Sequence, residues 1–241
     1  MSSPIIIFGA TGGIGAATAR ILSGKGYSLH LVGRNAASTQ LLAEELGASH
    51  SVGDVLTEGF IEQAVADAGD TLSGLLYAVG SITLKSLPRL KRDDFLRDFE
   101  LNALSAAMAV QAAIPALKKS GHSSVVLFSS VAASQGFGMH ASIGTAKAAV
   151  NGLTLSLAAE LAPNIRVNAI APSLTQTMLS KALWQNEASA QAISALHPIP
   201  RLGQAEDIAE VAAFLLSEKS GWITGQIIGV DGGRSSLRVK G

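Results

Sequence analysis

Two polar residues stand beside apolar segments, at places where a hydroxyl and an ammonium group can act on a ligand. Ser130 directly follows the apolar run 124–129, which is typical of a buried strand. The carboxyl ends of such strands form the edge where open α/β sheets bind ligands. Lys147 lies in segment 141–161, where the only other charge is Glu160. A lone ammonium in so apolar a helix indicates a functional role, and together with a hydroxyl it can polarise a carbonyl oxygen.

A glycine-rich segment near the start of the chain has the composition of a phosphate-binding loop. The apolar run 4–8 leads into Gly9-Ala10-Thr11-Gly12-Gly13-Ile14-Gly15, and the following segment 13–24 has helical spacing. Glycines let the backbone approach a pyrophosphate closely, and a helix amino end offers free N–H groups and a positive dipole. A simple structural turn is the alternative, but the position after a first strand favours dinucleotide binding.

The residues after the second apolar run bear on which dinucleotide is bound. The run 28–32 ends before Gly33-Arg34-Asn35, about 20 residues beyond the glycine loop. An acid at this place binds the ribose 2′-hydroxyl of NAD, whereas an arginine pairs with the 2′-phosphate of NADP. The guanidinium fork matches a phosphate bidentately. We therefore expect NADP to be preferred over NAD, the alternative being that Arg34 only stacks on the adenine.

The elements that must position these residues alternate regularly along the chain. Short apolar runs, typical of strands, occur at 4–8, 28–32, 49–53, 73–79, 124–129, 165–171 and 226–230. Segments with helical spacing lie between them, at 13–24, 38–46, 57–68, 93–119, 141–161 and 205–217. The alternation predicts a single-domain α/β fold, a Rossmann-type doubly wound parallel sheet of about seven strands with helices on both faces. We expect a dinucleotide-binding half at about 1–120 and a catalytic half at about 121–233 within one domain, 1–241.

Composition narrows the class of protein further. The chain has 241 residues, with 18 Lys plus Arg against 18 Asp plus Glu, and it contains no cysteine. Balanced charge argues against nucleic acid or an anionic membrane as partner, since both attract a basic surplus. The absence of cysteine excludes disulfides and thiolate metal sites. No stretch reaches 18 uninterrupted apolar residues, so we expect no membrane span. We also expect no metal site and a cytoplasmic location.

Two predicted helices carry unusually few charges. Segment 93–119 has none between Leu101 and Leu117, and segment 141–161 has only two. A helix that covers a sheet normally shows water a polar face. We therefore expect a homodimer or homotetramer formed through these helices, the alternative being an alanine-rich thick core.

Several motifs resemble those of the short-chain dehydrogenase/reductase family, over essentially the whole chain. The glycine spacing Gly9-x-x-x-Gly13-x-Gly15 is similar to the nucleotide loop of that family. Further similar segments are Ala159-Glu160-Leu161-Ala162-Pro163, Asn168-Ala169-Ile170-Ala171-Pro172, Ile223-Thr224-Gly225-Gln226 and Val230-Asp231-Gly232-Gly233. The resemblance implies catalytic roles for Ser130, Lys147 and Asn102. It also implies that Asp54 contacts the adenine amino group, that Lys147 binds the nicotinamide ribose and that Thr177 lies beside the nicotinamide.

Most residues expected to bind the dinucleotide lie at a strand end or in the segment that follows one, and Lys147 lies in the helical segment 141–161. They are Gly9, Thr11, Gly12, Gly13, Ile14, Gly15, Arg34, Asn35, Asp54, Val55, Ala78, Gly80, Lys147, Pro172 and Thr177. The resemblance further implies that a helix over 178–195 forms a substrate lid, in which Trp184 fits either a pocket wall or a packed core position. The polar tail from Arg234 onward has no expected place.

The chain departs from the family pattern at three positions. The family has a tyrosine four residues before the lysine, where this chain has Ile143, and Ser173 replaces a glycine. Tyr77 stands where the family has an asparagine, and the only other tyrosine is Tyr27. By sequence position neither tyrosine replaces the missing phenol, which in the family donates a proton to the carbonyl oxygen.

Three routes for the proton remain open in the absence of that phenol. His140 lies three residues before position 143 and titrates near neutral pH, although it also fits a surface loop. Ser142 is a neighbouring hydroxyl that also fits a helix cap. The third route is a water held by Ser130, Lys147 and Asn102. We include His140 among the catalytic residues.

The resemblance and the residues together predict an NADP(H)-dependent oxidoreductase acting on a small carbonyl or alcohol substrate. The alternative is an NADP(H)-binding pseudo-enzyme or sensor without dehydrogenase turnover. A lyase or dehalogenase without a cofactor is disfavoured by the glycine loop and Arg34.

Overall fold

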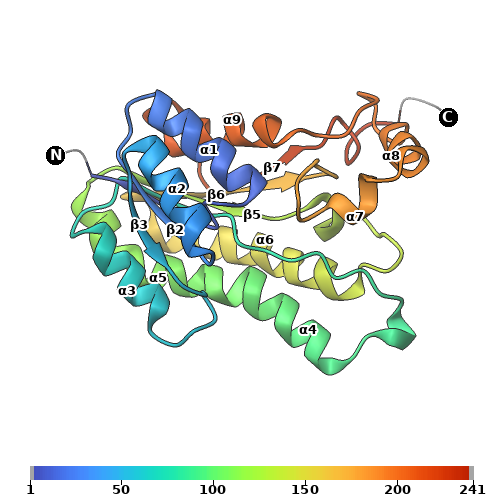
Figure 1. Cartoon of the computed structure of the whole chain (residues 1–241), viewed down its shortest axis with the longest axis horizontal. Coiled ribbons are helices and arrows are strands. Elements are labelled where there is room, and N and C mark those ends of the chain that lie inside the picture. Colours follow the sequence, from blue (N-terminus) through green and yellow to red (C-terminus); the bar gives the residue numbers. More distant parts are fainter. Residues whose placement is uncertain (1–2, 239–241) are drawn as a thin grey trace.

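The computed structural model describes residues 3–238, which form one parallel sheet between two layers of helices (Figure 1). The seven strands lie in the order β3-β2-β1-β4-β5-β6-β7, and all neighbours are parallel. They are β1 Ile5–Phe8, β2 Leu29–Gly33, β3 Ser49–Val52, β4 Gly74–Tyr77, β5 Ser123–Phe128, β6 Ile165–Pro172 and β7 Ile227–Val230. The predicted doubly wound, Rossmann-type fold is confirmed.

The helices follow the strands in the expected alternation. They are α1 Gly13–Gly24, α2 Ala36–Leu46, α3 Phe60–Ala68, α4 Arg92–Phe99, α5 Ser105–Lys119, α6 Ala141–Leu161, α7 Lys181–Trp184, α8 Glu187–Ser194 and α9 Ala205–Leu216. Short turns of tighter or wider helix are η1 Leu87–Arg89, η2 Glu100–Leu104, η3 Val131–Ala133 and η4 Glu218–Ser220.

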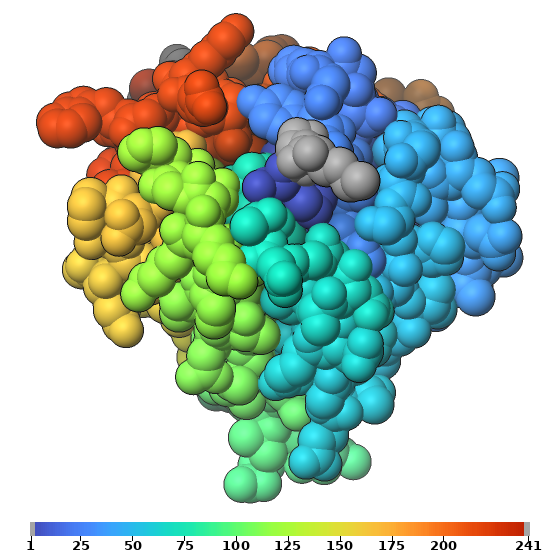
Figure 2. Space-filling model, turned by 90° about the vertical axis from the view of Figure 1, so that its left-hand side faces the viewer, coloured from blue at the N-terminus to red at the C-terminus, as the bar shows by residue number. Residues whose placement is uncertain are grey.

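Each strand of the sheet centre is buried on both faces, and β1 shows why. All four of its residues are fully buried, with Ile6 and Phe8 in one hydrophobic core and Ile5 and Ile7 in the other. Successive side chains of a strand point to opposite faces, so a run without polar residues must be covered twice. Helices α1, α2 and α9 cover one face, and α3, α5 and α6 cover the other (Figures 1 and 2).

The segment expected as one helix over 93–119 is interrupted by a turn of π-helix, η2. The hydroxyl of Tyr77 on the neighbouring strand β4 donates to the Leu101 carbonyl in this turn at 2.9 Å. Among the described residues, only this stretch, Arg92–Lys119, is long and apolar enough to cross a membrane, and half of its most apolar window is buried in the molecule. A core helix has the same properties, so its length is no argument for a membrane.

The expectation of a single helix over 178–195 is corrected by the structure, which forms two short helices, α7 and α8. The side chain of Asn186 accepts a hydrogen bond from the Ser189 N–H at 3.1 Å, and this cap starts a new helix. The Trp184 indole donates to the Ser180 hydroxyl at 3.1 Å. Leu183, and not Trp184, lines the cavity described below.

Candidate functional site

The turn from β1 into α1 requires glycine at two positions, Gly9 and Gly15. Gly9 has a φ of +78°, and a Cβ there would lie 2.8 Å from the Ala78 carbonyl carbon. A Cβ at Gly15 would collide with the Gly9 carbonyl oxygen. Helix α1 starts after Gly12, which caps it without a side chain. The amino end of α1 is therefore open to a bound anion, and this loop fits the two phosphates of a dinucleotide.

The end of β2 has no room for an acidic side chain. A Cβ at Gly33 would collide with the Thr39 hydroxyl, which is held in place by its 2.7 Å bond to the Asn35 carbonyl. The next residue, Arg34, is exposed, and its Nη1 lies 3.8 Å from Oδ2 of Asp54. The Asn35 side chain caps α2 by accepting from the Ser38 N–H. This strand end therefore offers a guanidinium and no carboxylate to a ribose.

A cavity of about 330 Å³ opens at the carboxyl edge of β4, β5 and β6. The predicted site residues that line it are Ile14, Ala78, Gly80, Ser130, His140, Lys147, Pro172 and Thr177. Those that do not are Gly9, Thr11, Gly12, Gly13, Gly15, Arg34, Asn35, Asp54, Val55 and Asn102. A Cβ at Gly13 would lie 2.7 Å from Cγ2 of Thr177, so the glycine loop touches the rim of the cavity.

Lys147 reaches the cavity from α6 with its ammonium group almost entirely buried. Its Nζ donates to the Phe128 carbonyl at the end of β5, at 2.9 Å. Burial lowers the pKa of Lys147 to about 8, and the charge of nearby Asp98 opposes that shift. A Cβ at Gly80 would lie 3.0 Å from Asn102 Oδ1 and 3.5 Å from Lys147 Nζ. The absence of a side chain at Gly80 thus leaves room for both the lysine and the asparagine beside its backbone.

Ser130 presents its hydroxyl to the cavity in an orientation suited to donation. The Oγ accepts the N–H of Ala132 at 3.1 Å and so caps the short helix η3. Because the oxygen already accepts one hydrogen bond, its own proton remains available to a ligand oxygen. Capping and ligand binding, which the sequence leaves as alternatives, are therefore compatible.

A buried carboxylate, Asp98, organises the wall behind the cavity. It accepts hydrogen bonds from the hydroxyls of Ser81, Thr83 and Ser142 at 2.8, 2.9 and 2.6 Å. Asn102 donates to the Ser81 hydroxyl and to the Asp98 carbonyl. Ser142 faces Asp98 and does not line the cavity. The sequence does not single out Asp98, although its spacing of four from Asn102 places both on one helix face.

His140 and two residues that the sequence does not single out form another side of the cavity. The Nδ1 of His140 donates to the Gly138 carbonyl at 2.7 Å, because a carbonyl can only accept, so Nε2 carries the free electron pair of the neutral ring. The His140 ring lies 5.4 Å from that of Phe137. Arg234, from the tail, places its guanidinium 5.0 Å from the Phe137 ring centroid. This arrangement brings a cation to the cavity.

Neither tyrosine enters the cavity, and Ile143 lines it four residues before Lys147. Tyr77 is buried in the core, and burial raises its pKa above the usual value. Tyr27 packs against the core on the side of α1.

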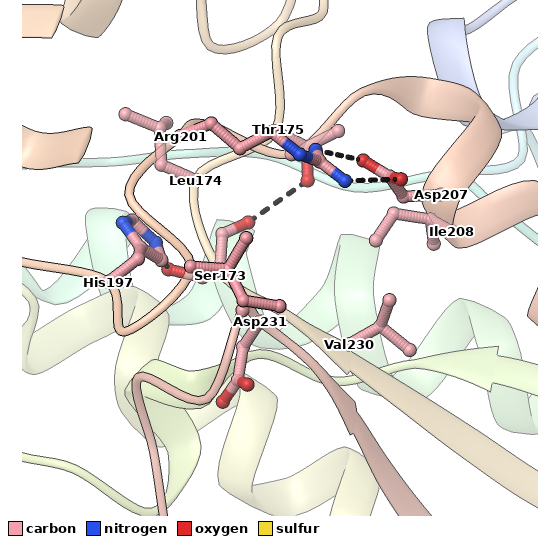
Figure 3. Close-up of a pocket in the computed structure, with 12 residues that line it drawn as sticks. Ser173, Leu174, Thr175, His197, Arg201, Asp207, Ile208, Val230 and Asp231 are labelled. Atoms are coloured by element: carbon pink, nitrogen blue, oxygen red, sulfur yellow. Dashed lines mark hydrogen bonds and ion pairs between the residues drawn. The ribbon is translucent and has the colours of Figure 1, made fainter. Parts of the chain in front are cut away.

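A second pocket, of about 210 Å³, adjoins the first (Figure 3). The two share Ser173, Leu174 and Thr175 on the segment that follows β6. The far side of the second pocket holds the ion pair of Arg201 with Asp207, in which Nη2 lies 2.8 Å from Oδ1.

Comparison with known proteins identifies the family. The family profile described as Enoyl-(Acyl carrier protein) reductase matches residues 9–235. The chain belongs to the short-chain dehydrogenase/reductase family. It is 34% identical to Dehydrogenase/reductase SDR family member 4 of Oryctolagus cuniculus, over 96% of this chain and 93% of the relative. It is 33% identical to a tropinone reductase homolog of Arabidopsis thaliana, over 95% of this chain and 90% of the relative.

A solved structure similar to this chain has the same fold. It is a gluconate 5-dehydrogenase from Burkholderia cenocepacia, in complex with NADP and tartrate. The TM-score is 0.92 at 27% identity, with 98% of this chain and 96% of that chain covered. The expected family is confirmed, and this short-chain dehydrogenase/reductase is an oxidoreductase that binds a nicotinamide cofactor. The individual roles assigned to its site residues stay predictions.

Proposed function

We propose that this short-chain dehydrogenase/reductase uses NADP(H) to reduce a small carbonyl compound or to oxidise the corresponding alcohol. The observation that supports the cofactor preference is the end of β2, where Gly33 leaves no room for an acid and Arg34 is exposed. A guanidinium there pairs with a 2′-phosphate, which NAD lacks. The NADP named with the related gluconate 5-dehydrogenase agrees with this preference.

The chemistry of the cavity residues suits a carbonyl substrate. A bound nicotinamide supplies a hydride to the carbonyl carbon or takes one from the alcohol. Ser130 donates its free proton in a hydrogen bond to the carbonyl oxygen, and Lys147 stabilises negative charge nearby. The mainly apolar lining, Ile14, Val79 and Ile143 among it, keeps water away from the reacting atoms and strengthens these interactions.

The proton that the carbonyl oxygen must gain needs a donor other than the tyrosine of the family. Ile143 occupies that position and has no proton to give. Ser142 is engaged with Asp98 outside the cavity, which leaves His140 and a water near Lys147 among the routes that the sequence suggests. The pseudo-enzyme or sensor is the competing function, since loss of general acid catalysis removes about 10²–10⁴-fold in rate.

Turnover with NADPH across a panel of small aldehydes and ketones tests the proposal. We expect NADPH oxidation by the wild type, and a loss of about 100-fold or more in kcat/KM for Lys147→Ala. The exposed Lys118→Ala variant at the end of α5 is the matched control and should keep the wild-type rate. NADPH binding without turnover on any substrate would support the pseudo-enzyme instead.

We also propose that the protein forms a homodimer or homotetramer through α4–α5 and α6. The outer surfaces of these helices, with η2 between them, expose Leu96, Phe99, Leu104 and Leu155. Burying such side chains against a second copy gains about 25 cal/mol for each Å² removed from water. The cytoplasmic location stays a prediction.

A further inference from the structure

A serine and a histidine are hydrogen-bonded at the boundary between the two pockets. The His197 ring is buried, and its Nδ1 lies 2.9 Å from the Ile193 carbonyl oxygen. A carbonyl only accepts, so Nδ1 carries the proton and Nε2 of the neutral ring is left as an acceptor. Nε2 lies 2.8 Å from the Ser173 Oγ. The Ser173 hydroxyl therefore donates to the imidazole, which is the arrangement that moves protons from a hydroxyl.

Ser173, on the segment that follows β6, lines both pockets. On one side it lines the larger cavity together with Ser130 and Lys147. On the other it contacts His197, which lines only the second pocket. Nearby along the chain, Thr177 is the residue expected beside the nicotinamide, and Pro172 is among those expected to bind the dinucleotide. The hydroxyl thus stands at the end of the cavity where the reacting carbon is expected.

The charged side chains that line the second pocket with His197 are Asp231, Arg201 and Asp207. Burial alone would raise the pKa of Asp231, but hydrogen bonds from Ser235 and Gly233 and the nearby His197 hold it below its usual value. Asp231 is therefore a carboxylate at neutral pH. Arg201 and Asp207, which line the same pocket, are paired with each other and nearly cancel.

We propose that Ser173 is a catalytic proton donor and acceptor for the substrate oxygen, and that His197 is the positioning residue that returns a proton to the serine. This inference rests on the proposed carbonyl chemistry. In reduction, carbon gains a hydride and oxygen gains a proton. The Oγ–H bond of Ser173 breaks as the O–H bond of the product forms. The neutral His197 ring takes a proton from solvent through the second pocket and passes it from Nε2 to the serine oxygen, which returns both groups to their starting forms. In oxidation each proton moves the other way.

Two of the departures from the family pattern support a catalytic role for Ser173 and His197. Ile143 removes the phenol, and Ser173 adds a hydroxyl where the family has a glycine. His140, the other histidine of the cavity, donates to the Gly138 carbonyl, and the structure gives it no hydroxyl partner among residues 3–238. Among the described residues, Ser173 is the only hydroxyl of the cavity lining that donates a hydrogen bond to an imidazole.

The test combines kinetics with a measurement that needs no substrate. We expect Ser173→Ala and His197→Ala to lower kcat about 100-fold, with KM and the Kd for NADPH unchanged. Added imidazole should restore activity to His197→Ala and not to Ser173→Ala. Introducing the family tyrosine as Ile143→Tyr should restore the rate of Ser173→Ala. Ser134→Ala and His122→Gln, both exposed, are the matched controls and should keep the wild-type rate.

The independent measurement is the nitrogen spectrum of the histidines in the full chain without cofactor. We expect Nε2 of His197 to have the chemical shift of an unprotonated nitrogen, and that signal to disappear in His197→Ala. A protonated Nε2 in the neutral ring would overturn the relay. Wild-type rates in both Ser173→Ala and His197→Ala would overturn it too, while leaving the proposed function intact. A wild type that binds NADPH but turns over no carbonyl or alcohol would contradict both proposals.

Discussion

At the scale of single residues, hydrogen-bond partners decide which hydroxyls can take part in chemistry. Ser130 and Ser142 lie close to Lys147 in the sequence pattern, but only Ser130 lines the cavity. The Ser142 hydroxyl donates a hydrogen bond to the Asp98 carboxylate at 2.6 Å. That hydrogen bond directs the Ser142 proton to a buried carboxylate and away from the cavity. Position in the sequence cannot show which of the two hydroxyls is free, because the partner of Ser142 comes from another element.

Cofactor selectivity is predicted to depend on one guanidinium. Arg34→Ala should weaken NADPH binding by about 10- to 100-fold, since charge-assisted bonds contribute roughly 1.5–3 kcal/mol. NADH, which has no 2′-phosphate, should lose much less. The measurement is the Kd of each nucleotide by calorimetry. Arg238→Ala, in the exposed tail, is the matched control and should change neither constant. Equal losses for the two nucleotides would show that Arg34 only stacks on the adenine.

At the scale of elements, the sequence is sufficient for the sheet and insufficient for its surroundings. The predicted strand positions agree with the structure to within two residues, because the central strands are buried on both faces and are read directly as apolar runs. The helix predicted to start at 38 starts at Ala36, since the Asn35 cap is two residues earlier than the apolar spacing suggests. The π turn η2 and the division into α7 and α8 depend on contacts with Tyr77 and on a local cap, which periodicity does not show.

The candidate site, too, can be predicted from the sequence only in part. Glycines and strand ends are visible in the sequence, so the nucleotide loop and Lys147 can be predicted. Asp98, Arg234 and the bond of Ser173 to His197 depend on long-range contacts, across 44 residues for Asp98 with Ser142 and 24 for the serine with the histidine. A departure from the family pattern, at Ser173, is the signal that points to the last of these.

The pairing of β2 with the edge strand β3 carries a histidine that must stay neutral. His30 lies buried between the hydroxyls of Ser49 and Ser51, at 2.9 Å from each. Ser51 donates to Asp67, so its oxygen accepts from Nε2, and Nδ1 accepts from Ser49. Burial lowers the pKa of His30 to about 4, from a usual value of 6.5. Protonation would place a charge in the sheet and remove the Ser49 bond.

Stability is therefore predicted to fall as the pH decreases from 6.5 towards 4. In this range the unfolded chain binds a proton at His30 and the folded chain does not, so acid favours unfolding. The full contribution of His30 is about 3 kcal/mol, and above pH 6.5 none of it is lost. Urea unfolding at pH 7 and pH 4.5 measures it. His30→Gln should reduce the difference between the two values, whereas His122→Gln, an exposed histidine, should leave it unchanged. An undiminished difference in His30→Gln would contradict the assignment.

At the scale of the whole molecule, the exposed apolar residues of α4, η2 and α6 determine the predicted assembly. Phe99 and Leu155 keep 45% and 54% of their surface exposed in the single chain. A two-fold axis would bring the same helices of two copies together, because isologous interfaces use one surface twice. We expect light scattering to give a mass of two or four times 24.6 kDa.

Charged substitutions on this surface should separate the copies without unfolding them. Phe99→Glu and Leu155→Glu are expected to lower the mass towards that of one chain, since a carboxylate buried in an apolar interface loses its hydration. Leu41→Glu is the matched control, because Leu41 on α2 is 68% exposed on the opposite layer of helices and should not change the mass. The cavity is lined within one chain, so the separated variants should still bind NADPH. A wild type that scatters as one chain would rule out this surface as an interface and leave the alanine-rich core as the reason for its composition.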